Sequence, residues 1–421
     1  MKLSPPRGTR DFFPEDMRLR TWLFDHWRDV SEQFGFEAYD APVVEHEEIY
    51  IRKAGEEITG QLYNFEDKGG RRLALRPEMT PSLARMILQK GSALSLPAKW
   101  YAIPQCWRYE RTTRGRKREH YQWNVDIFGV AGMTAEAELL AIIAAFFQRI
   151  GLGADDVGIK ISSRKVLQSV LKDLGVTDAQ FAPVCVLVDK LEKVSREELQ
   201  GEFEALGLSE NTVDQLIATL SIKDLDGLAA VLGENHEAVQ DLRQLWGMAE
   251  AYGYADWLQF DASIVRGLAY YTGTVFEAFD RGATLRAVCG GGRYDRLLST
   301  FGGKDQPACG FGFGDVVILE LLKDKGVLPT LAQVVDDVVF PYNEELRPAA
   351  VAVAQALRST GRRVDLILEK KRTKAAFKHA DRLNAERMVL VAPDEWARGE
   401  VMFKDLKSGE QTVVPFASLG S

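Results

Sequence analysis

Polar and apolar residues alternate along residues 107–110 and 121–127, and a short basic loop joins the two stretches. This period of two predicts two strands that pair as a hairpin. Side chains two positions apart share one face of a strand, so a register with an even residue sum places five polar side chains on one wall. These side chains are Arg108, Glu110, His120, Gln122 and Asp126. An arginine, an amide and acids that face one way indicate recognition of a polar, charged ligand.

Apolar residues at helical spacing predict three helices in the first third of the chain. The expected ranges are 15–34, 80–91 and 134–151, each followed or ended by a glycine. In the second helix we expect Thr80 as the N-cap and Pro81 at the first helical position. Between the first two helices, residues 39–44 resemble a strand, and Pro42 suits an edge or an interface.

The pattern changes between residues 171 and 247, where Leu, Glu, Asp and Lys recur at helical periods and predict a mostly helical insertion. Strand-like sequence returns at Phe260 and continues beyond Ala287. After a linker at residues 326–329, strands and helices alternate, which predicts a small parallel α/β domain. The expected elements are strands at 338–340, 363–368 and 388–391 and helices at 345–359 and 373–384.

Charge and cysteine content narrow the class of protein. The 421 residues predict two or three domains, and a net charge of −8 argues against a surface that attracts nucleic acid everywhere. Two local basic clusters, residues 111–118 and 362–378, still favour a polyanionic partner, although charge runs are often only solvated faces. Four cysteines without metal-ligand or disulfide spacing indicate a reduced protein. Without a signal peptide or a long apolar run, we expect it to be soluble and cytosolic.

Three further motifs are candidates for chemistry. Glu78 precedes a helix N-terminus, a position where a carboxylate often marks a ligand site. Arg266 lies in an otherwise apolar segment, 265–273, and an arginine there needs an anionic partner, although a bulged strand with a core tyrosine pair would also explain the segment. Residues 289–295 and 310–315 predict glycine-rich turns that lead into helices. These turns suit either a dinucleotide loop of irregular spacing or close packing of a strand on a helix.

In this order, residues 6–12, 75–80, 108–111, 265–271 and 290–295 resemble the signature segments of histidyl-tRNA synthetase, a family of class II aminoacyl-tRNA synthetases. The likeness runs from Pro6 to the C-terminus. It implies an α+β catalytic domain with an antiparallel sheet flanked by helices (1–168 and 252–326). It also implies a helical insertion (169–251) and a C-terminal α/β anticodon-binding domain (332–421). A homodimer interface is implied near residues 35–44.

The resemblance also implies the roles of individual residues. Arg108 and Arg266 are the catalytic arginines near the α-phosphate of ATP, and both also adjoin the histidine. Further residues implied to bind the substrate histidine are Glu78, Thr80, Gln122, Asp126, Tyr270 and Tyr271. Further residues implied to bind ATP are Glu110, Arg116 and His120. The substrates implied are L-histidine, histidine tRNA and ATP with Mg²⁺, and no resident metal site is assigned.

The chain departs from the family pattern at three important positions, Ala269, His120 and Val317. Ala269 replaces an aspartate next to the tyrosine pair. Val317 replaces the arginine that holds the γ-phosphate of ATP in motif 3, so another cation is needed, and Arg114, Arg118 and Arg293 are open candidates. Asp126 and His120 also replace a glutamate and a larger aromatic residue.

The sequence thus predicts a cytosolic histidine–tRNA ligase with two rivals. One rival is a non-catalytic protein resembling the regulatory subunit of ATP phosphoribosyltransferase, which the missing motif 3 arginine favours. The other is a nucleotide-dependent oxidoreductase based on the glycine-rich segments, which leaves the polar hairpin wall unexplained.

Overall fold

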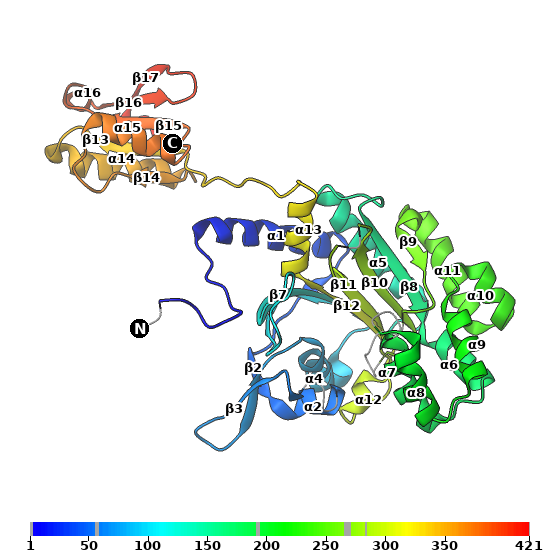
Figure 1. The fold of residues 1–421 in the computed structure, drawn as a ribbon. Helices are drawn as coiled ribbons and strands as arrows, with labels where there is room; N and C mark the ends of the chain where they lie inside the picture. Colours follow the sequence, from blue (N-terminus) through cyan, green and yellow to red (C-terminus); the bar gives the residue numbers. More distant parts are fainter. Residues whose placement is uncertain (1–2, 55–58, 191–193, 265–270, 283, 421) are drawn as a thin grey trace. The chain divides into compact units, whose positions relative to one another are not determined.

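The computed structural model of the chain divides into two compact units (Figure 1). One unit comprises Met1–Asp11 and Trp22–Leu328, and the other comprises Phe12–Thr21 and Pro329–Ser421. The residues that the structure describes are 3–54, 59–190, 194–264, 271–282 and 284–420.

A nine-stranded sheet is the frame of the larger unit. Its order is β1-β5-β7-β12-β11-β10-β8-β9, and β6 pairs with β7 beside this path. Neighbouring strands are antiparallel except at the two edges, where β1 pairs with β5 and β8 with β9 in parallel. The strands are β1 (Glu37–Ala38), β5 (Ala98–Ala102), β6 (Gln105–Trp107), β7 (Glu119–Phe128), β8 (Val157–Ser163), β9 (Leu258–Phe260), β10 (Thr274–Asp280), β11 (Cys289–Arg293) and β12 (Ala308–Gly314). The expected sheet flanked by helices is confirmed, with parallel edges in addition.

The alternating sequence of β7 gives this strand one apolar face, which packs on helices. Trp123 is fully buried and stacks on Trp27 of α1 (Pro14–Gln33), with ring centroids 5.9 Å apart. Its edge also meets Phe146 of α5 (Thr134–Arg149) at 5.5 Å. Burial of a side chain such as Phe146 contributes roughly 1.5–3 kcal/mol. This packing fixes the orientation of β7, so Gln122, Asn124 and Asp126, which alternate with Trp123, must point to the opposite side of the sheet.

The glycine-rich segments are strands of this sheet, so the prediction that they are turns is wrong. Gly291 of β11 and Gly310 of β12 lie in the antiparallel centre, where the backbones approach so closely that a Cβ on Gly291 would be 2.3 Å from the Gly310 oxygen. The expected helices follow them as α12 (Leu297–Thr300) and α13 (Asp315–Asp324). Antiparallel strands of this kind exclude the parallel strand–turn–helix loop of a dinucleotide-binding fold.

A three-stranded sheet, in the order β2-β4-β3, lies in the same unit. Its elements are β2 (Val44–His46), α2 (Glu47–Ala54), β3 (Tyr63–Glu66) and β4 (Arg72–Leu75). The prediction of a strand at residues 39–44 is wrong for most of its length, because residues 40–43 form hydrogen bonds with Arg76 instead of with a neighbouring strand. The Arg76 guanidinium bonds Asp40 at 2.8 Å and the Ala41 carbonyl, and its amide bonds the Val43 carbonyl at 2.9 Å.

The predicted helix at residues 80–91 is α4 (Thr80–Lys90), but the prediction of its cap is wrong. Met79 is the N-cap residue, and no side chain caps the helix. The Met79 carbonyl already accepts a bond of 3.0 Å from the Leu83 amide, so Thr80 belongs to the first turn. The hydroxyl of Thr80 therefore has no capping role.

Helices fill the chain between β8 and β9, which confirms the predicted helical character of this insertion. They begin at Arg164, before the residue expected, and Ser163, Ser195, Ser209 and Asp224 cap four of them through their side chains. The helices are α6 (Arg164–Asp173), α7 (Asp178–Lys190), α8 (Arg196–Ala205), α9 (Glu210–Leu220), α10 (Leu225–Leu232) and α11 (Glu237–Tyr252).

The second unit contains a five-stranded sheet in the order β14-β13-β15-β16-β17. Its first three strands are parallel, as predicted, but an antiparallel hairpin extends the sheet beyond them. The hairpin was not predicted, because the elements before it already complete a regular α/β alternation. The elements are β13 (Asp337–Pro341), α14 (Arg347–Ser359), β14 (Val364–Leu366), α15 (Thr373–Arg382), β15 (Arg387–Val391), α16 (Pro393–Ala397), β16 (Glu400–Asp405) and β17 (Gln411–Pro415).

Candidate active site

The predicted polar wall is formed by the β6–β7 hairpin. The strand predicted over residues 107–110 is wrong beyond its first residue, because β6 ends at Trp107 and the Glu110 amide bonds the Arg108 carbonyl instead of a neighbouring strand. The register pairs Cys106 with His120 and Trp107 with Glu119, so the residue sum is even, as expected. The Arg108 amide continues the pairing with a bond of 2.8 Å to the Arg118 carbonyl. The side chains of His120, Gln122, Asn124 and Asp126 therefore lie opposite the packed apolar face of β7.

A cavity of about 230 Å³ opens along this wall. Six of the side chains assigned above to ATP or histidine line it: Arg108, Glu110, Arg116, His120, Gln122 and Tyr271. The other side of the cavity is formed by β10, β11, β12 and the first turn of α13, including Val275, Gly290, Gly312 and Val317. Segments more than 150 residues apart in sequence thus converge on one space.

Glycines of β12 make room for two polar side chains of β7. A Cβ on Gly312 would lie 2.6 Å from Nε2 of Gln122, and a Cβ on Gly310 would lie 2.1 Å from Oδ1 of Asp126. A side chain at either position would force the residue across it to move. The glycines of β12 therefore allow Gln122 and Asp126 to lie across this strand.

Asp126 lies beneath the cavity rather than on its surface. Its side chain is buried, with 4% exposed, and Oδ1 accepts a hydrogen bond from the hydroxyl of Tyr294. Tyr294 follows β11 and is itself buried. Asp126 is not among the lining residues, so its contact with a ligand requires entry of that ligand deeper into the sheet.

The segment at residues 76–80 runs beside the hairpin. Nε of Arg108 donates a bond of 2.9 Å to the Pro77 carbonyl, and the Trp107 amide donates one of 2.8 Å to the Arg76 carbonyl. Glu78 and Thr80 are half-buried next to this junction and do not line the cavity as described. Arg266, Tyr270 and Ala269 lie outside the described residues.

The charge of the cavity lining is mainly positive. Among the described residues that line it, four are Arg or Lys and one is a carboxylate: Arg108, Arg116, Lys117, Arg286 and Glu110. Burial lowers the pKa of His120, and the positive charges of Arg108, Arg10 and Arg286 lower it further, to about 3. The imidazole is therefore neutral near pH 7, and the lining as a whole attracts an anion.

Glu110 and Arg116 form an ion pair within this lining. Nε of Arg116 lies 3.1 Å from Oε2 of Glu110, and the carboxylate is the more buried of the two. Arg116 belongs to a tight turn in which the Thr113 and Arg116 backbones bond each other and Gly115 has a φ of +76°. A ligand that binds between Glu110 and Arg116 must break this ion pair.

A buried ionic network holds β7 against the start of α13. Arg10 contacts Glu119 at 2.7 Å and Asp315 at 2.9 Å, and Asp315 also accepts a bond of 2.9 Å from the Tyr121 amide. Burial raises the pKa of Asp315 to about 6, although the charge of Arg10 opposes this shift. The network positions the first turn of α13, which brings Val317 to the cavity.

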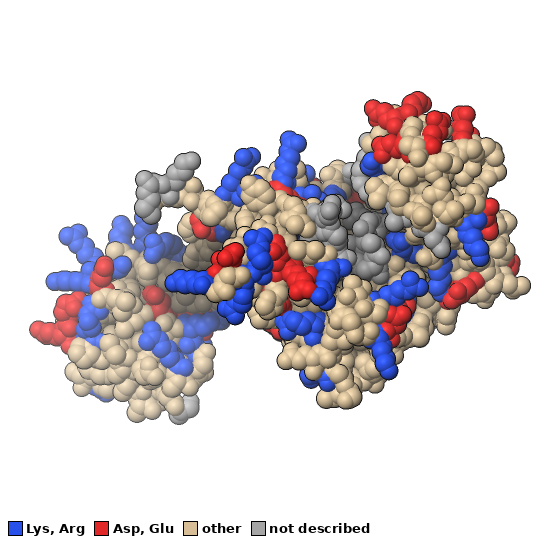
Figure 2. All heavy atoms as spheres, turned by 90° about the horizontal axis from the view of Figure 1, so that it is seen from below, with Lys and Arg blue, Asp and Glu red and all other residues tan. Residues whose placement is uncertain are grey.

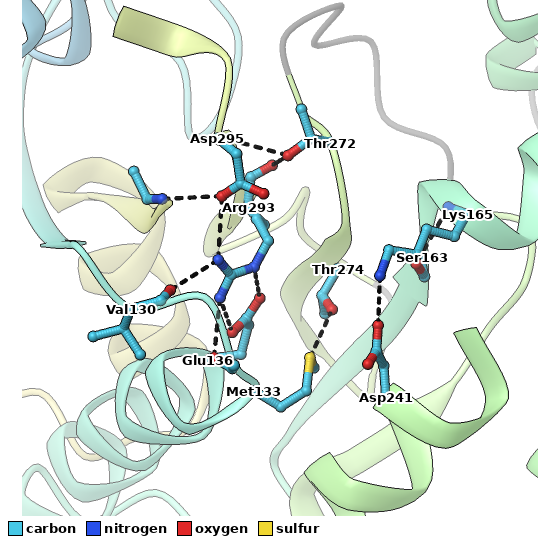
Figure 3. A network of polar contacts seen from close by, with 12 residues as sticks. Val130, Met133, Glu136, Ser163, Lys165, Asp241, Thr272, Thr274, Arg293 and Asp295 are labelled. Atoms are coloured by element: carbon cyan, nitrogen blue, oxygen red, sulfur yellow. Dashed lines mark hydrogen bonds and ion pairs between the residues drawn. The ribbon is translucent and has the colours of Figure 1, made fainter. Parts of the chain in front are cut away.

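The three arginines considered for the γ-phosphate do not line the cavity. Arg114 pairs with Glu320 and Asp324 of α13, and Arg118 lies 4.0 Å above the Tyr109 ring. Arg293 is 6% exposed, and its Nε and Nη2 each bond a carboxylate oxygen of Glu136 at 2.6 Å (Figure 3). All three side chains contact other parts of the protein instead of the cavity.

Two lining cations, Lys117 and Arg286, were not assigned from the sequence. Lys117 belongs to the basic hairpin loop, so the loop composition could have suggested it. Arg286 follows Leu285 and precedes the apolar start of β11, and no local pattern separates it from a solvated arginine. Only the sheet topology brings it to the hairpin.

Neither a metal cluster nor a membrane helix is evident in the described part of the chain. No group of three or more His, Cys, Asp or Glu side chains there could hold a metal ion. Within the same residues, every helix is too short or too polar to cross a membrane.

Comparison with known proteins identifies the family. The sequence model "Histidyl-tRNA synthetase" matches residues 8–314, and "Anticodon binding domain" matches residues 336–421. The chain is 59% identical to a histidine–tRNA ligase, chloroplastic/mitochondrial, from Arabidopsis thaliana, over 99% of this chain and 86% of the relative. It is 40% identical to a histidine–tRNA ligase from Opitutus terrae, over 97% and 95%. The crystal structure of histidyl-tRNA synthetase from Nostoc sp. PCC 7120 superposes with a TM-score of 0.81, at 30% identity and coverage of 100% and 98%. The chain belongs to the histidyl-tRNA synthetase family.

Proposed function

We propose that this protein is a histidine–tRNA ligase that binds ATP and L-histidine together in the cavity of the β6–β7 hairpin. The observation that carries the proposal is the composition of one wall, where Arg108, His120 and Gln122 face the same space. The cationic part of the lining suits a triphosphate, and the Gln122 amide with the Asp126 carboxylate beneath it suits an imidazole. Family membership supports both substrates.

In the first step an oxygen of the histidine carboxylate attacks the α-phosphorus of ATP. The bond from this phosphorus to the bridging oxygen of the β-phosphate breaks, and pyrophosphate leaves. Negative charge builds on the α-phosphate oxygens, so a guanidinium placed there stabilises the transition state more than the ground state. We assign this role to Arg108, whose bond to the Pro77 carbonyl orients it, and to Arg266.

In the second step a hydroxyl of the terminal ribose of histidine tRNA attacks the carbonyl carbon of the adenylate. The ester bond forms, the acyl–phosphate bond breaks, and AMP leaves with the proton of the hydroxyl carried on its phosphate oxygen. The resulting product carries histidine on the 3′ end of the tRNA. Arg116, on the exposed hairpin turn, is the residue we expect nearest to the incoming tRNA end.

Histidine recognition requires partners for two ring nitrogens. Imidazole offers one donor and one acceptor when neutral, and an amide with a carboxylate can satisfy both. We assign the ring contacts to Gln122 and Asp126 and the remaining contacts to Glu78, Thr80, Tyr270 and Tyr271. An amino acid without ring nitrogens would leave these buried groups unpaired, which is a strong basis for rejection.

The adenine base is assigned to Glu110 and His120. The Glu110 carboxylate can accept a bond from the adenine amino group, and a neutral His120 ring offers a flat surface for stacking. Mg²⁺ enters as part of the substrate, because this ion keeps its waters and binds mainly through the phosphates of ATP.

Histidine-dependent exchange of labelled pyrophosphate into ATP tests the proposal directly. We expect purified full-length protein to catalyse exchange with L-histidine and with no other amino acid. Silence with folded protein would refute ligase activity. Binding of histidine without exchange and without tRNA affinity would instead support the regulatory paralogue of ATP phosphoribosyltransferase.

The C-terminal unit supports tRNA as the partner. The exposed side chains of Tyr342 and Leu368 come just after the parallel strands β13 and β14, at one edge of the sheet. Two exposed basic residues, Lys370 and Arg372, come shortly after Leu368 in the sequence. This unit, at the left of Figure 2, displays many basic side chains with acidic ones among them. Aromatic and cationic groups together suit single-stranded RNA.

A filter-binding assay with histidine tRNA tests this surface. We expect the double variant Lys370→Ala/Arg372→Ala to bind tRNA about 10-fold more weakly at moderate salt, because two phosphate contacts are lost. Pyrophosphate exchange should not change, since it needs no tRNA. Unaltered tRNA affinity would exclude this segment as a binding surface.

A homodimer and a cytosolic location complete the proposal. The dimer is expected to use residues 35–44, and sedimentation of the full chain would test it. Three of the four free cysteines are buried, which suits a reducing compartment. Imaging of a tagged protein would test the location, as the Arabidopsis relative is named for organelles.

A further inference from the structure

We propose that Arg286 binds the terminal phosphates of ATP, an inference that rests on the proposed ligase function. Arg286 lies between β10 and β11, is exposed, and lines the cavity together with Gly115 and Val317. Nothing in the sequence pattern assigned a role to it.

The position of Arg286 is defined by its neighbours across the cavity. A methyl group on Gly115 would lie 3.4 Å from Cγ2 of Val317 and 3.8 Å from both Cγ and Cδ of Arg286. The turn of the hairpin, the first turn of α13 and the β10–β11 segment therefore meet at one point. Val317 contributes only an apolar surface there, and the stem of Arg286 lies beside it.

Arg286 is close to the residues that we assign to ATP. In addition to burial, the positive charges of Arg108, Arg10 and Arg286 all lower the pKa of His120, so Arg286 and Arg108 are near the same imidazole. If Arg108 meets the α-phosphate, a second cation near His120 is placed for the phosphates beyond it. A guanidinium suits this task because its planar fork can bond two phosphate oxygens at once.

The other arginines near the hairpin lie outside the cavity or already have an assigned role. Arg114 contacts Glu320 and Asp324 at 2.9 and 2.5 Å, and Arg293 is enclosed with Glu136. Arg116 pairs with the Glu110 carboxylate that is assigned to adenine. Lys117 lines the same cavity but offers a single ammonium, so we assign the terminal phosphates to Arg286.

Calorimetric binding of MgATP and of AMP separates this role from a general effect on the cavity. We expect Arg286→Ala to weaken ATP binding roughly 10–100-fold, the usual effect of losing charge-assisted hydrogen bonds. AMP binding should stay within about twofold, because AMP lacks the terminal phosphates. The matched control is Arg114→Ala, an arginine of the same hairpin outside the cavity, which should alter neither ligand.

A second-site variant tests the location. The double variant Arg286→Ala/Val317→Arg places a guanidinium on α13, across the same cavity from position 286. We expect the ATP affinity of this variant to recover at least partly. Unchanged ATP affinity in Arg286→Ala, equal losses for ATP and AMP, or no recovery in the double variant would overturn the inference. Histidine-dependent exchange by the unmodified protein tests the ligase function separately, so the two proposals can fail independently.

Discussion

Strand β11 separates two arginines with opposite surroundings. Arg293, its last residue, is buried and bonded by both oxygens of Glu136, with further bonds to the carbonyls of Val130 and Gly132. Arg286, three residues before the strand, is exposed at a cavity in which basic side chains outnumber acidic ones. The first region balances its charge internally, and the second accumulates charge of one sign.

This difference distinguishes an arginine with a structural role from the one that we propose to bind substrate. Burial opposes the charge of Arg293, but the hydrogen bonds and the charge interaction with Glu136 raise its pKa overall, so Arg293 stays charged and its bonds to Glu136 hold α5 against the sheet. The cavity is lined, among the described residues, by four basic residues and one acidic residue. The basic side chains repel one another, and an anionic ligand relieves this repulsion. Removal of one partner should therefore affect stability in the first region and substrate binding in the second.

The largest effect is expected from breaking the internal pair. Glu136→Ala leaves a buried guanidinium without its carboxylate, which typically lowers the free energy of unfolding by about 3–5 kcal/mol. Urea denaturation of the full chain measures it, with Glu136→Gln as the milder control that keeps the shape. A loss under about 1 kcal/mol would show that the remaining carbonyl partners suffice.

The catalytic region should lose rate rather than stability. Arg266→Ala is expected to slow histidine-dependent pyrophosphate exchange roughly 10²-fold or more, because a donor to the transition state is lost. Its urea midpoint should match that of the unmodified protein. The control is Arg281→Ala, whose bonds to the Ala154 and Asp256 carbonyls lie away from the cavity lining. An unchanged rate would remove Arg266 from the mechanism.

A smaller effect is expected where the cavity depends on shape. Gly312→Ala brings a methyl group against the Gln122 amide, which must move from its position across β12. We expect KM for histidine to rise about 10-fold with a smaller change in kcat, as one hydrogen bond is misplaced. Gly201→Ala in α8 meets nothing within 4 Å and serves as the control. Equal KM values in both variants would place Gln122 outside histidine recognition.

The smallest effect concerns pH. His120 has a pKa of about 3 in the folded protein, below its ordinary value of 6.5. When pH falls below about 6.5, the unfolded chain binds a proton that the folded protein refuses, so stability falls with decreasing pH. Between pH 7 and 5 this residue should account for about 1–2 kcal/mol. Between pH 7 and 5, the His120→Gln variant should lose less stability than the unmodified protein. If the urea midpoints of the two proteins fall by the same amount over this interval, the low pKa of His120 is contradicted.

Sequence periodicity predicted the hairpin wall well because the side-chain period of a strand is fixed. Once Trp123 packs inward, Gln122 has only one side to face. The sequence rules for helix caps were less accurate at the ends of elements. Thr80 was predicted to be the N-cap, but the helix begins one residue earlier, so Met79 is the N-cap and Thr80 lies in the first turn.

Charge partners could not be predicted, because they depend on contacts across the fold. Glu136 is 157 residues from Arg293 in sequence, and nothing local distinguishes Arg293 from Arg286. The glycines of β12 were mistaken for turns for the same reason, since the need for them arises from the Gln122 and Asp126 side chains of another strand. Periodicity carries information about faces but not about partners.

A crystal structure of the full chain with MgATP and L-histidine tests the central claim most directly. We predict the α-phosphate at Arg108, the terminal phosphates between Arg286 and Gly115, and the imidazole within hydrogen-bonding distance of Gln122. Nucleotide bound at another surface, or histidine remote from Gln122 and Asp126, would contradict the account.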